Sequence, residues 1–432
     1  MRILHVIARY WPGVGGAEMH LAEISARLAA EGHQVTVATT DALDFQTLSD
    51  PRRRRVATLD EQHDGVRILR LPVRHLPACP RGYAAWRYLL RYLSASAVTP
   101  VRGLAWLSRF TPWVPGLWHW AQTNRDEFDL VGGMSILFEP VVAAGLSMAQ
   151  RRQVPFVIYP LTHLGVGAVP GGDHLSSFYT MRHQIALVRA SQAVLAQTAT
   201  ERAFYEGKGV PGERISVVGP GVDPAKVLGG EGQRFREKHG IQGPLVASLA
   251  SLDYSKGTVS LVEAVRQVRG TGRQVALALA GTMMESFRLY WEGLAPEDRQ
   301  GVQVLGPVSE EEKRDLLAAC DVFAVPSRTD SFGIAYLEAW LYGKPVIGAR
   351  AWGIGDVIQD DNNGRLVPFG DAPALAAAIV DLLDHPETRA ALGACGQEEV
   401  YRSHTWEHKY AQVRGIYTEL MKAPESPTSA SH

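Results

Sequence analysis

Two acidic side chains, Asp330 and Glu338, stand eight positions apart in the stretch PSRTDSFGIAYLEAWLYGKP, residues 326–345. The first lies in a loop of Ser, Thr, Asp and Gly, and the second in a helical pattern that begins near Gly333. A helix rises ~1.5 Å per residue, so the two attachment points lie roughly 12 Å apart. An acid/base pair of carboxylates needs a separation of about 5–9.5 Å. The spacing therefore favours binding the two ends of one elongated ligand over proton transfer.

The start of this helix suits an anion between those two ends. Unpaired backbone N–H groups point out of the first turn of a helix, where the helix dipole also stabilises negative charge. A diphosphate fits there, with one carboxylate on sugar hydroxyls and the other on a ribose diol. An isolated D-x7-E pattern is more often a solvated helix face. The surrounding order of strand, Pro-Ser, Phe-Gly and Gly-x-Pro-Val favours a binding site instead.

A second loop, ASLDYSKG at residues 250–257, follows the apolar run 245–249 and carries the cation Lys256. A lysine ammonium can neutralise the charge of a leaving diphosphate. Taken alone, Lys256 could also be a solvated residue before a helix. Arg328, within the acidic loop, is a candidate for a second positive charge on the same phosphates.

Three further candidates, Gly15, Gly16 and His163, lie in the first half of the chain. Glycines at a strand-to-helix turn let the backbone approach a ligand, although this pair could also be a flexible turn. A lone histidine is more often structural. Because His163 follows the apolar run 156–159, a contact with a sugar or an acceptor hydroxyl is the alternative. We expect no nucleophilic role for it.

Short apolar runs alternate with helical-period stretches along the chain, which is typical of βαβ units on parallel sheets. The fold class is therefore α/β, and a first helix is predicted at 17–31. Strands are predicted at 2–8, 35–39, 66–71, 130–132, 156–159 and 193–196 in the first half, and at 245–249, 275–280, 302–305, 322–325, 345–347 and 365–368 in the second.

The length of 432 residues predicts two domains. A bridge rich in Gly and Pro near Gly221 is typical of a boundary, where few contacts cross. We predict domains at 1–220 and 221–402, a final helix at 403–423 and a disordered tail at 424–432. Ligands are expected at the carboxyl ends of both sheets.

Composition excludes several classes of protein. Hydrophobic residues make up 46% and charged residues 21% of the chain, and the formal net charge is -1, so no global field attracts nucleic acid. Three scattered cysteines, Cys79, Cys320 and Cys395, form no CxxC motif, which indicates a reducing compartment without structural zinc. The N-terminus has no cleavage pattern of a signal peptide, and no apolar run is long enough to span a bilayer. We expect a cytoplasmic protein.

The run 326–345 resembles glycosyltransferase family 4 (glycosyl transferases group 1), whose hallmark is Glu, seven residues, Glu, with Phe-Gly after the first acid. This chain has the spacing, the Phe-Gly and the second Glu, while Asp330 replaces the first. Trp352-Gly353, Asp356 and Asn363-Gly364 follow where similar sequences carry their next loop. The resemblance implies a GT-B fold, with two Rossmann-like domains facing across a cleft and a C-terminal helix packing back on the N-terminal domain. It also implies retaining transfer of a hexose from a nucleotide-diphosphate sugar to an acceptor hydroxyl, without a resident cofactor.

The resemblance also assigns roles to single residues. It places the 1–220 domain on the acceptor side and the nucleotide sugar on the 221–402 domain. Lys256 then contacts the donor diphosphate, with Ser251 where the family carries an Arg, and His163 lies beside the reaction centre. Gly15 and Gly16 form the loop near the donor phosphate and the acceptor. The catalytic residues are accordingly His163, Lys256 and Asp330, and the other donor-binding residues are Gly15, Gly16, Ser251, Phe332, Gly333, Ile334, Ala335 and Glu338.

No Asp-x-Asp motif occurs in the chain, so the divalent-metal site of the other large glycosyltransferase fold is not supported. We predict a metal-independent enzyme. Its chemistry would rest on charge stabilisation and positioning, which fits the absence of an evident acid/base dyad.

The segment from Gly65 to Arg125 contains nine Arg and five Trp residues but no Asp or Glu. Its middle, residues 81–110, has helical spacing with Arg81, Arg87 and Arg91 among apolar neighbours, and the Arg- and Trp-rich part 81–125 is the predicted contact surface. Such a basic, aromatic surface is typical of contact with a membrane or an anionic acceptor. The alternative is that the Trp and Leu side chains are core. Expected partners are therefore a nucleotide sugar, a sugar, lipid-linked or small-molecule acceptor, and the inner face of a membrane.

Other functions remain open at this point. A GT-B sugar-nucleotide epimerase would need acidic and basic groups crowded on the sugar, and a phosphorylase-like enzyme would need a cofactor lysine in a segment that is not found. A non-catalytic sugar-nucleotide-binding protein is an alternative because of Ser251 and Asp330. Neither G-x-S-x-G nor G-x-x-x-x-G-K-[ST] occurs, so an α/β-hydrolase and a P-loop enzyme are set aside.

Overall fold

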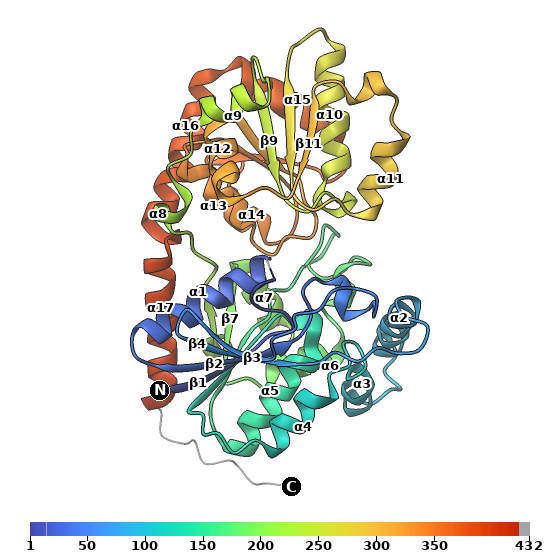
Figure 1. Cartoon of the computed structure of the whole chain (residues 1–432), viewed down its shortest axis with the longest axis vertical. Coiled ribbons are helices and arrows are strands. Elements are labelled where there is room, and N and C mark those ends of the chain that lie inside the picture. Colours follow the sequence, from blue (N-terminus) through green and yellow to red (C-terminus); the bar gives the residue numbers. More distant parts are fainter. Residues whose placement is uncertain (14, 423–432) are drawn as a thin grey trace. The chain divides into compact units, whose positions relative to one another are not determined.

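The computed structural model describes residues 1–13 and 15–422, so the predicted tail at 424–432 lies outside the described residues. Contacts between Cα atoms divide the chain into two compact units. Among the described residues, unit 1 comprises those of Met1–Thr162, His174–Gly219 and the stretch from Lys409 to Lys422, and unit 2 comprises His163–Asp173 and Pro220–His408. Figure 1 labels many of their helices and strands.

Unit 1 is built on an eight-stranded sheet in the order β3-β4-β2-β1-β5-β6-β7-β8. Strand β3 is antiparallel to β4, and all other neighbours are parallel. Its strands are β1 (Arg2–Val6), β2 (Gln34–Thr40), β3 (Asp60–His63), β4 (Val66–Leu71), β5 (Leu130–Met134), β6 (Phe156–Tyr159), β7 (Ala193–Ala196) and β8 (Ile215–Val217). Its helices are α1 (Gly16–Ala30), α2 (Arg81–Ala95), α3 (Val101–Ser108), α4 (Pro115–Thr123), α5 (Glu139–Arg152), α6 (Arg182–Arg189) and α7 (Ala199–Gly207).

Unit 2 is built on a six-stranded parallel sheet in the order β11-β10-β9-β12-β13-β14. Its strands are β9 (Leu245–Leu249), β10 (Ala276–Ala280), β11 (Val302–Gly306), β12 (Val322–Val325), β13 (Val346–Ala349) and β14 (Gly364–Val367). Its helices are α8 (Pro224–Val227), α9 (Gly232–Lys238), α10 (Thr258–Gly270), α11 (Glu285–Gly293), α12 (Glu310–Ala319), α13 (Ile334–Leu341), α14 (Ile354–Val357), α15 (Ala372–Asp384) and α16 (Pro386–Glu399), and α17 (Trp406–Lys422) leads from this unit into unit 1.

The predicted α/β class is confirmed, and both units have parallel-rich sheets. Buried parallel strands are apolar along their whole length, as β12 is, and this made them visible in the sequence. Two strands were not predicted. Strand β3 has the sequence DEQH and β8 has three residues, and both lie at sheet edges, where an apolar run is not needed.

The segment His163–Asp173 lies within unit 2, although the residues before and after it along the chain belong to unit 1. The predicted domain from 1 to 220 did not include such an exchange. The contact division itself falls between Gly219 and Pro220. His163 is therefore grouped with the loops of unit 2.

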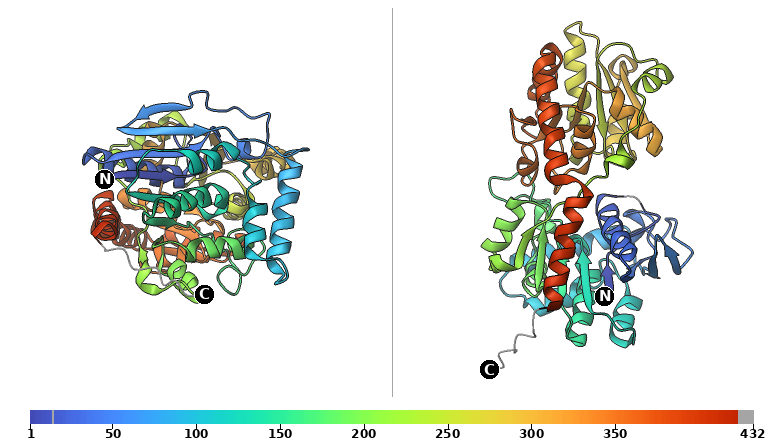
Figure 2. Two further views of the ribbon diagram at one scale, coloured as in Figure 1. Left: turned by 90° about the horizontal axis from the view of Figure 1, so that it is seen from below. Right: turned by 90° about the vertical axis from the view of Figure 1, so that its left-hand side faces the viewer.

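The final helix, α17, packs on the sheet of unit 1 (Figure 2). Tyr417 is fully buried, and its hydroxyl lies 3.0 Å from His5 Nε2 and 3.0 Å from the hydroxyl of Tyr159. His5 Nδ1 in turn lies 2.8 Å from Ser25 Oγ on α1. One buried network thus joins the last helix to β1, β6 and α1.

Replacing Tyr417 by phenylalanine is expected to destabilise unit 1. The substitution leaves two buried polar groups, on His5 and Tyr159, without their partner, which costs roughly 1–3 kcal/mol. Urea unfolding followed by circular dichroism measures the change. Tyr401→Phe is the matched control, because Tyr401 is 46% exposed. Equal stability of the two variants would contradict a structural role of the network.

Candidate active site

The two candidate loops of unit 2 follow adjacent strands at the centre of its sheet. Strand β9 pairs with β12 there, and the strand order reverses at this point. In open parallel sheets the crevice at such a reversal, beyond the carboxyl ends of the strands, is the usual ligand site. Residues 250–257 follow β9 and residues 326–333 follow β12. The topology therefore brings the two loops together at one edge.

Lys256 and Asp330 form an ion pair between these loops. Their side chains are 20% and 21% exposed. The loops also touch at Gly257, which has a φ of 75°, and a Cβ atom there would lie 2.3 Å from the carbonyl oxygen of Pro326. Glycine is required at this position for both reasons.

The charges of this cluster are set by burial and by the pair itself. Burial opposes ionisation of Asp330, but Lys256 outweighs it and holds the pKa of Asp330 below its usual value. Burial, helped by the charge of Lys256 and opposed by that of Asp330, lowers the pKa of His163 from 6.5 to about 4. His163 is therefore a neutral imidazole at neutral pH, close to a carboxylate and an ammonium. These are the three residues predicted to be catalytic.

Glu338 pairs with a residue outside the cluster of His163, Lys256 and Asp330. It is 6% exposed on α13, and its Oε1 accepts a hydrogen bond of 3.0 Å from Lys313 Nζ on α12. Lys313 also pairs with Glu310 Oε2 at 2.7 Å. Burial raises the pKa of Glu338, while Lys313 opposes the rise. Asp330 and Glu338 thus have separate cations.

Replacing Lys313 by methionine is expected to make ligand binding at Glu338 more sensitive to acid. Lys313 lowers the pKa of Glu338, so without it the carboxyl takes up a proton at higher pH and stops accepting hydrogen bonds. Calorimetric titration with nucleoside diphosphates from acid to neutral pH measures how affinity falls at low pH, which is the acid limb of the binding profile. We expect this limb to move to higher pH in Lys313→Met and to stay in place in Lys313→Arg. The same limb in all three proteins would contradict the coupling.

The first turn of α13 has no side-chain cap for its backbone N–H groups. Gly333 precedes the helix with a φ of 89°. A Cβ atom at Gly333 would lie 2.4 Å from the ring of Tyr336, so the turn needs glycine. Phe332 is 4% exposed and its ring packs against that of His404. Only the backbone of Phe332 can therefore serve a ligand, together with that of Ile334 and Ala335.

Ser251 is exposed beyond β9, and Arg328 lies in the neighbouring loop. The Arg328 backbone N–H donates to the carbonyl oxygen of Ser255 at 3.0 Å. Its guanidinium carbon lies 5.7 Å and 5.2 Å from the ring centres of Tyr254 and Phe369. The buried Nε has no hydrogen-bond partner among residues 1–13 and 15–422. Arg328 thus joins the two loops and retains a free donor.

Gly15 and Gly16 belong to unit 1, at the start of α1. A Cβ atom at Gly15 would lie 2.3 Å from Glu18 Oε2 and 2.8 Å from Arg9 Nη2. Arg9 and Glu18 are both 4% exposed and form an ion pair of 2.7 Å. A larger residue at position 15 would therefore have to displace the ends of this ion pair, and the extended φ of Gly15 itself needs no glycine.

Of the three arginines of the predicted basic, aromatic surface, Arg81 is exposed, Arg91 is partly buried and Arg87 is buried. Arg87 is 6% exposed and donates to Glu139 Oε1 at 2.7 Å, because the buried carboxylate needs a cation. Arg91 lies 5.5 Å from the ring centres of Tyr88 and Phe178. Arg81 on α2 and Arg102 on α3 remain exposed, and large apolar or aromatic side chains of these helices and of the loop between them are exposed as well. These apolar or aromatic side chains are Tyr88, Leu89, Tyr92, Val98 and Trp106, and we call them the α2–α3 surface.

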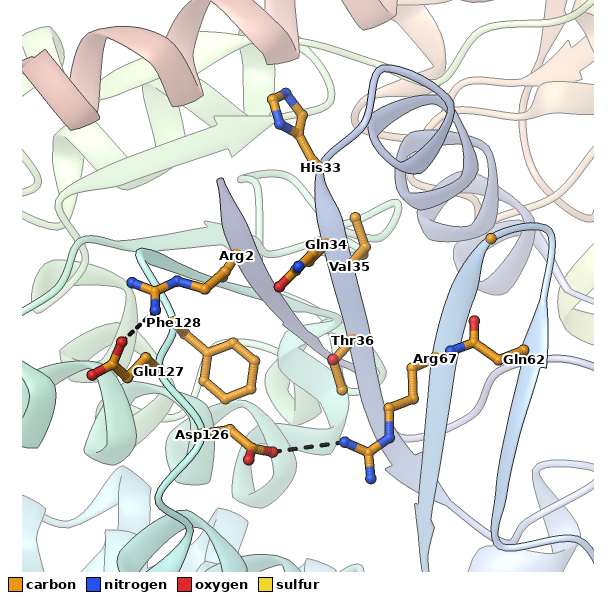
Figure 3. A pocket seen from close by; sticks show the side chains of 11 residues that line it. Arg2, His33, Gln34, Val35, Thr36, Gln62, Arg67, Asp126, Glu127 and Phe128 are labelled. Atoms are coloured by element: carbon orange, nitrogen blue, oxygen red, sulfur yellow. Dashed lines mark hydrogen bonds and ion pairs between the residues drawn. The ribbon is translucent and has the colours of Figure 1, made fainter.

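A surface pocket of about 540 Å³ lies elsewhere on unit 1 (Figure 3). It is lined by residues at the amino ends of β1 and β2. Arg2 is paired there with Glu127, and Arg67 lies 3.7 Å from Asp126 Oδ2. The pocket is at the opposite end of the strands from the loops that carry Gly15 and Gly16, and its arginines are already neutralised.

Two further properties concern metals and membranes. Among the described residues, no group of three or more His, Cys, Asp or Glu side chains could hold a metal ion. Within residues 1–13 and 15–422, every helix is too short or too polar to cross a bilayer.

Sequence reasoning missed Lys313. It lies in the run EEEKR at the start of α12, which has the pattern of a solvated helix face. Its partner Glu338 is 25 residues away, so no helical or strand period joins the two. Only packing of α12 beside α13 brings them together.

Two family models match the chain without overlapping. Residues 15–221 match the model described as Glycosyl transferase 4-like domain, and residues 231–399 match Glycosyl transferases group 1. The D-inositol 3-phosphate glycosyltransferase of Xylanimonas cellulosilytica is 28% identical over 421 residues, which is 94% of this chain and 92% of the relative.

Solved structures show the same fold. Alr3699/HepE of Anabaena, in complex with UDP and glucose, has a TM-score of 0.71 at 19% identity and covers 97% of this chain and 99% of its own. Sucrose-phosphate synthase from Thermosynechococcus elongatus has a TM-score of 0.71 at 21% identity and covers 98% of this chain and 100% of its own. The chain belongs to the GT-B glycosyltransferases of the family 4 type.

Proposed function

We propose that the protein is a retaining hexosyltransferase, which moves a hexose from a nucleotide-diphosphate sugar to an acceptor hydroxyl without a metal ion. The observation that carries the proposal is the cluster of His163, Lys256 and Asp330 at the reversal point of the unit 2 sheet. A donor would lie across this edge, with its diphosphate at the start of α13.

Each residue then has one task. Lys256 neutralises the diphosphate as the bond to the sugar breaks. Arg328 supplies a second donor, because Ser251 stands where the family carries an arginine. Asp330 accepts hydrogen bonds from the sugar hydroxyls. Neutral His163 binds the sugar or the acceptor hydroxyl. Glu338 accepts from the ribose diol, since a carboxylate forms strong charge-assisted hydrogen bonds.

The mechanism relies on charge and position. Leaving-group departure and acceptor attack take place on one face of an oxocarbenium-like sugar. The fixed ammonium of Lys256 stabilises the charge that develops on the diphosphate, and fixed groups need no reorganisation during the reaction. The ion pair with Asp330 keeps Lys256 in place before the donor binds.

Thermal unfolding with a panel of UDP-, GDP- and ADP-sugars tests the donor site. A bound donor stabilises the folded state by mass action, so one nucleotide class should raise Tm. Transfer assays with that donor, with and without EDTA, then test the reaction and the metal. No stabilisation by any sugar nucleotide would overturn the donor site, and loss of activity in EDTA would overturn metal independence.

We also propose that the acceptor is lipid-linked or part of a polysaccharide or glycoconjugate and that the protein contacts a membrane through the α2–α3 surface. Tyr92, Val98 and Trp106 are 74%, 89% and 56% exposed, and aromatic side chains partition into the membrane interface. Cosedimentation with anionic liposomes at low salt should capture the protein, and the triple substitution of these residues by serine should release it. Equal sedimentation of both proteins would contradict this surface.

A non-catalytic sugar-nucleotide-binding protein is a second candidate, favoured by Ser251 in place of an arginine. Such a protein would gain thermal stability from a sugar nucleotide but would neither transfer nor hydrolyse the sugar. The same panel followed by product analysis separates the two functions.

A further inference from the structure

The segment His163–Asp173 changes units twice along the chain. Thr162, the residue before it, is held in unit 1. Its backbone N–H donates to Glu201 Oε1 at 2.7 Å, and its hydroxyl lies 2.6 Å from that of Tyr205. His163 is the next residue and the first of those grouped with unit 2. The contacts that hold this segment on unit 2 therefore contribute to the position of His163.

Trp352 makes two of these contacts. It follows β13 in unit 2, and its backbone N–H donates to the carbonyl oxygen of Gly165 at 2.9 Å. Its indole Nε1–H donates to the carbonyl oxygen of Gly167 at 2.8 Å. One side chain and its own backbone thus bind two alternate carbonyls of the segment. An indole N–H can only donate, so the direction of this bond is unambiguous.

A hydrogen bond within the segment also stabilises it. Asp173 Oδ2 accepts from the backbone N–H of Val166 at 2.8 Å. Gly165 has a φ of 76°, and a Cβ atom there would lie 2.0 Å from the same carboxylate oxygen. These contacts stabilise the turn after His163, and Trp352 binds that turn to unit 2.

We propose that Trp352 is a positioning residue, which holds the segment 163–173 so that His163 lies beside Lys256 and Asp330. The role of His163 at the sugar rests on the proposed function, whereas its position does not. Trp352 itself need touch neither donor nor acceptor. Its effect reaches the reaction through the two carbonyls, because His163 lies only two residues before Gly165.

The electrostatics of His163 report this position. Burial, together with Lys256, holds the pKa of its imidazole at about 4, and Asp330 acts in the opposite direction. A segment that loosens would expose the ring to water and move it from these two charges. Its pKa would then rise towards the ordinary value of 6.5.

The test is Trp352→Phe, which removes the indole donor and keeps an aromatic ring and the backbone bond. We expect kcat to fall roughly tenfold, which corresponds to about 1.4 kcal/mol of activation free energy, with the KM for the donor little changed. Asp173→Ala, which loosens the segment from within, should lower kcat in the same way. Trp291→Phe is the control, because Trp291 lies in the same unit and stacks on Phe287.

A second readout does not depend on activity. Proteins labelled at histidine Cε1 are titrated by NMR, with the His163 signal assigned by its loss in His163→Gln. We expect the His163 pKa to rise in Trp352→Phe and Asp173→Ala and to stay in place in Trp291→Phe. An unchanged His163 titration in Trp352→Phe would overturn the proposal. Absence of transfer by the wild-type protein would instead overturn the proposed function, and the titration would still decide the position.

Discussion

Replacing Glu338 by alanine is expected to abolish binding of nucleoside diphosphates and of the sugars that carry them. The carboxylate is 6% exposed and faces Lys313, so it is fixed in position before a ligand arrives. Two hydrogen bonds from a ribose diol to a carboxylate contribute about 1.5–3 kcal/mol each. Their loss should weaken binding at least about a hundredfold, since 1.4 kcal/mol is a factor of ten.

Calorimetric titration of the wild-type and variant proteins measures this loss. Glu310→Gln is the matched control, because Glu310 also pairs with Lys313 but its side chain is 73% exposed. Glu338→Gln separates charge from shape, and we expect it to bind weakly as well. Circular dichroism and Tm establish that each variant is folded. Unchanged affinity in a folded Glu338→Ala protein would remove Glu338 from the donor site.

Replacing Lys256 by alanine is expected to lower kcat by about two to three orders of magnitude, the usual effect of removing one fixed group that stabilises transition-state charge. The KM for the donor should change much less, because the charge on the leaving diphosphate grows as the bond breaks. Asp330 would also lose the cation that holds its pKa below the usual value. Its pKa should rise, so the acid limb of the pH–rate profile should move to higher pH.

Steady-state kinetics over a range of pH measures both effects. Lys208→Ala is a control for a lysine exposed at the end of α7. Asp330→Asn tests the other half of the pair, and it should remove the acid limb that belongs to Asp330. Full activity of Lys256→Ala at neutral pH would show that Lys256 has no part in the transition state.

Local patterns carried much of the prediction. The strand–loop–helix order around Asp330 and Glu338 is contained in the twenty residues 326–345, and the strand before Lys256 is a short apolar run. Such elements depend on neighbours along the chain, so hydrophobic period and turn residues reveal them. The α/β class and most strands of both sheets followed in the same way.

Tertiary packing decided the rest. Lys313 and Glu338 lie on different helices, Arg87 pairs with Glu139 at a distance of 52 residues along the chain, and Trp352 binds Gly167 across 185 residues. The hydrophobic periodicity of a sequence does not reveal which residues pair across such long separations along the chain. Arg87 looked like part of a basic outer face because helical spacing tells which residues share a face but not which face is buried.

The sequence by itself determined the class of fold, the two loops that carry Lys256 and Asp330, and the acid at Glu338. These are local features of strands, turns and helix starts. Only the tertiary structure decided that Lys256 pairs with Asp330, that Glu338 has a cation of its own, and that His163 is grouped with unit 2. The physical reason is that buried charges and buried polar groups need partners, and a partner is chosen by proximity in space.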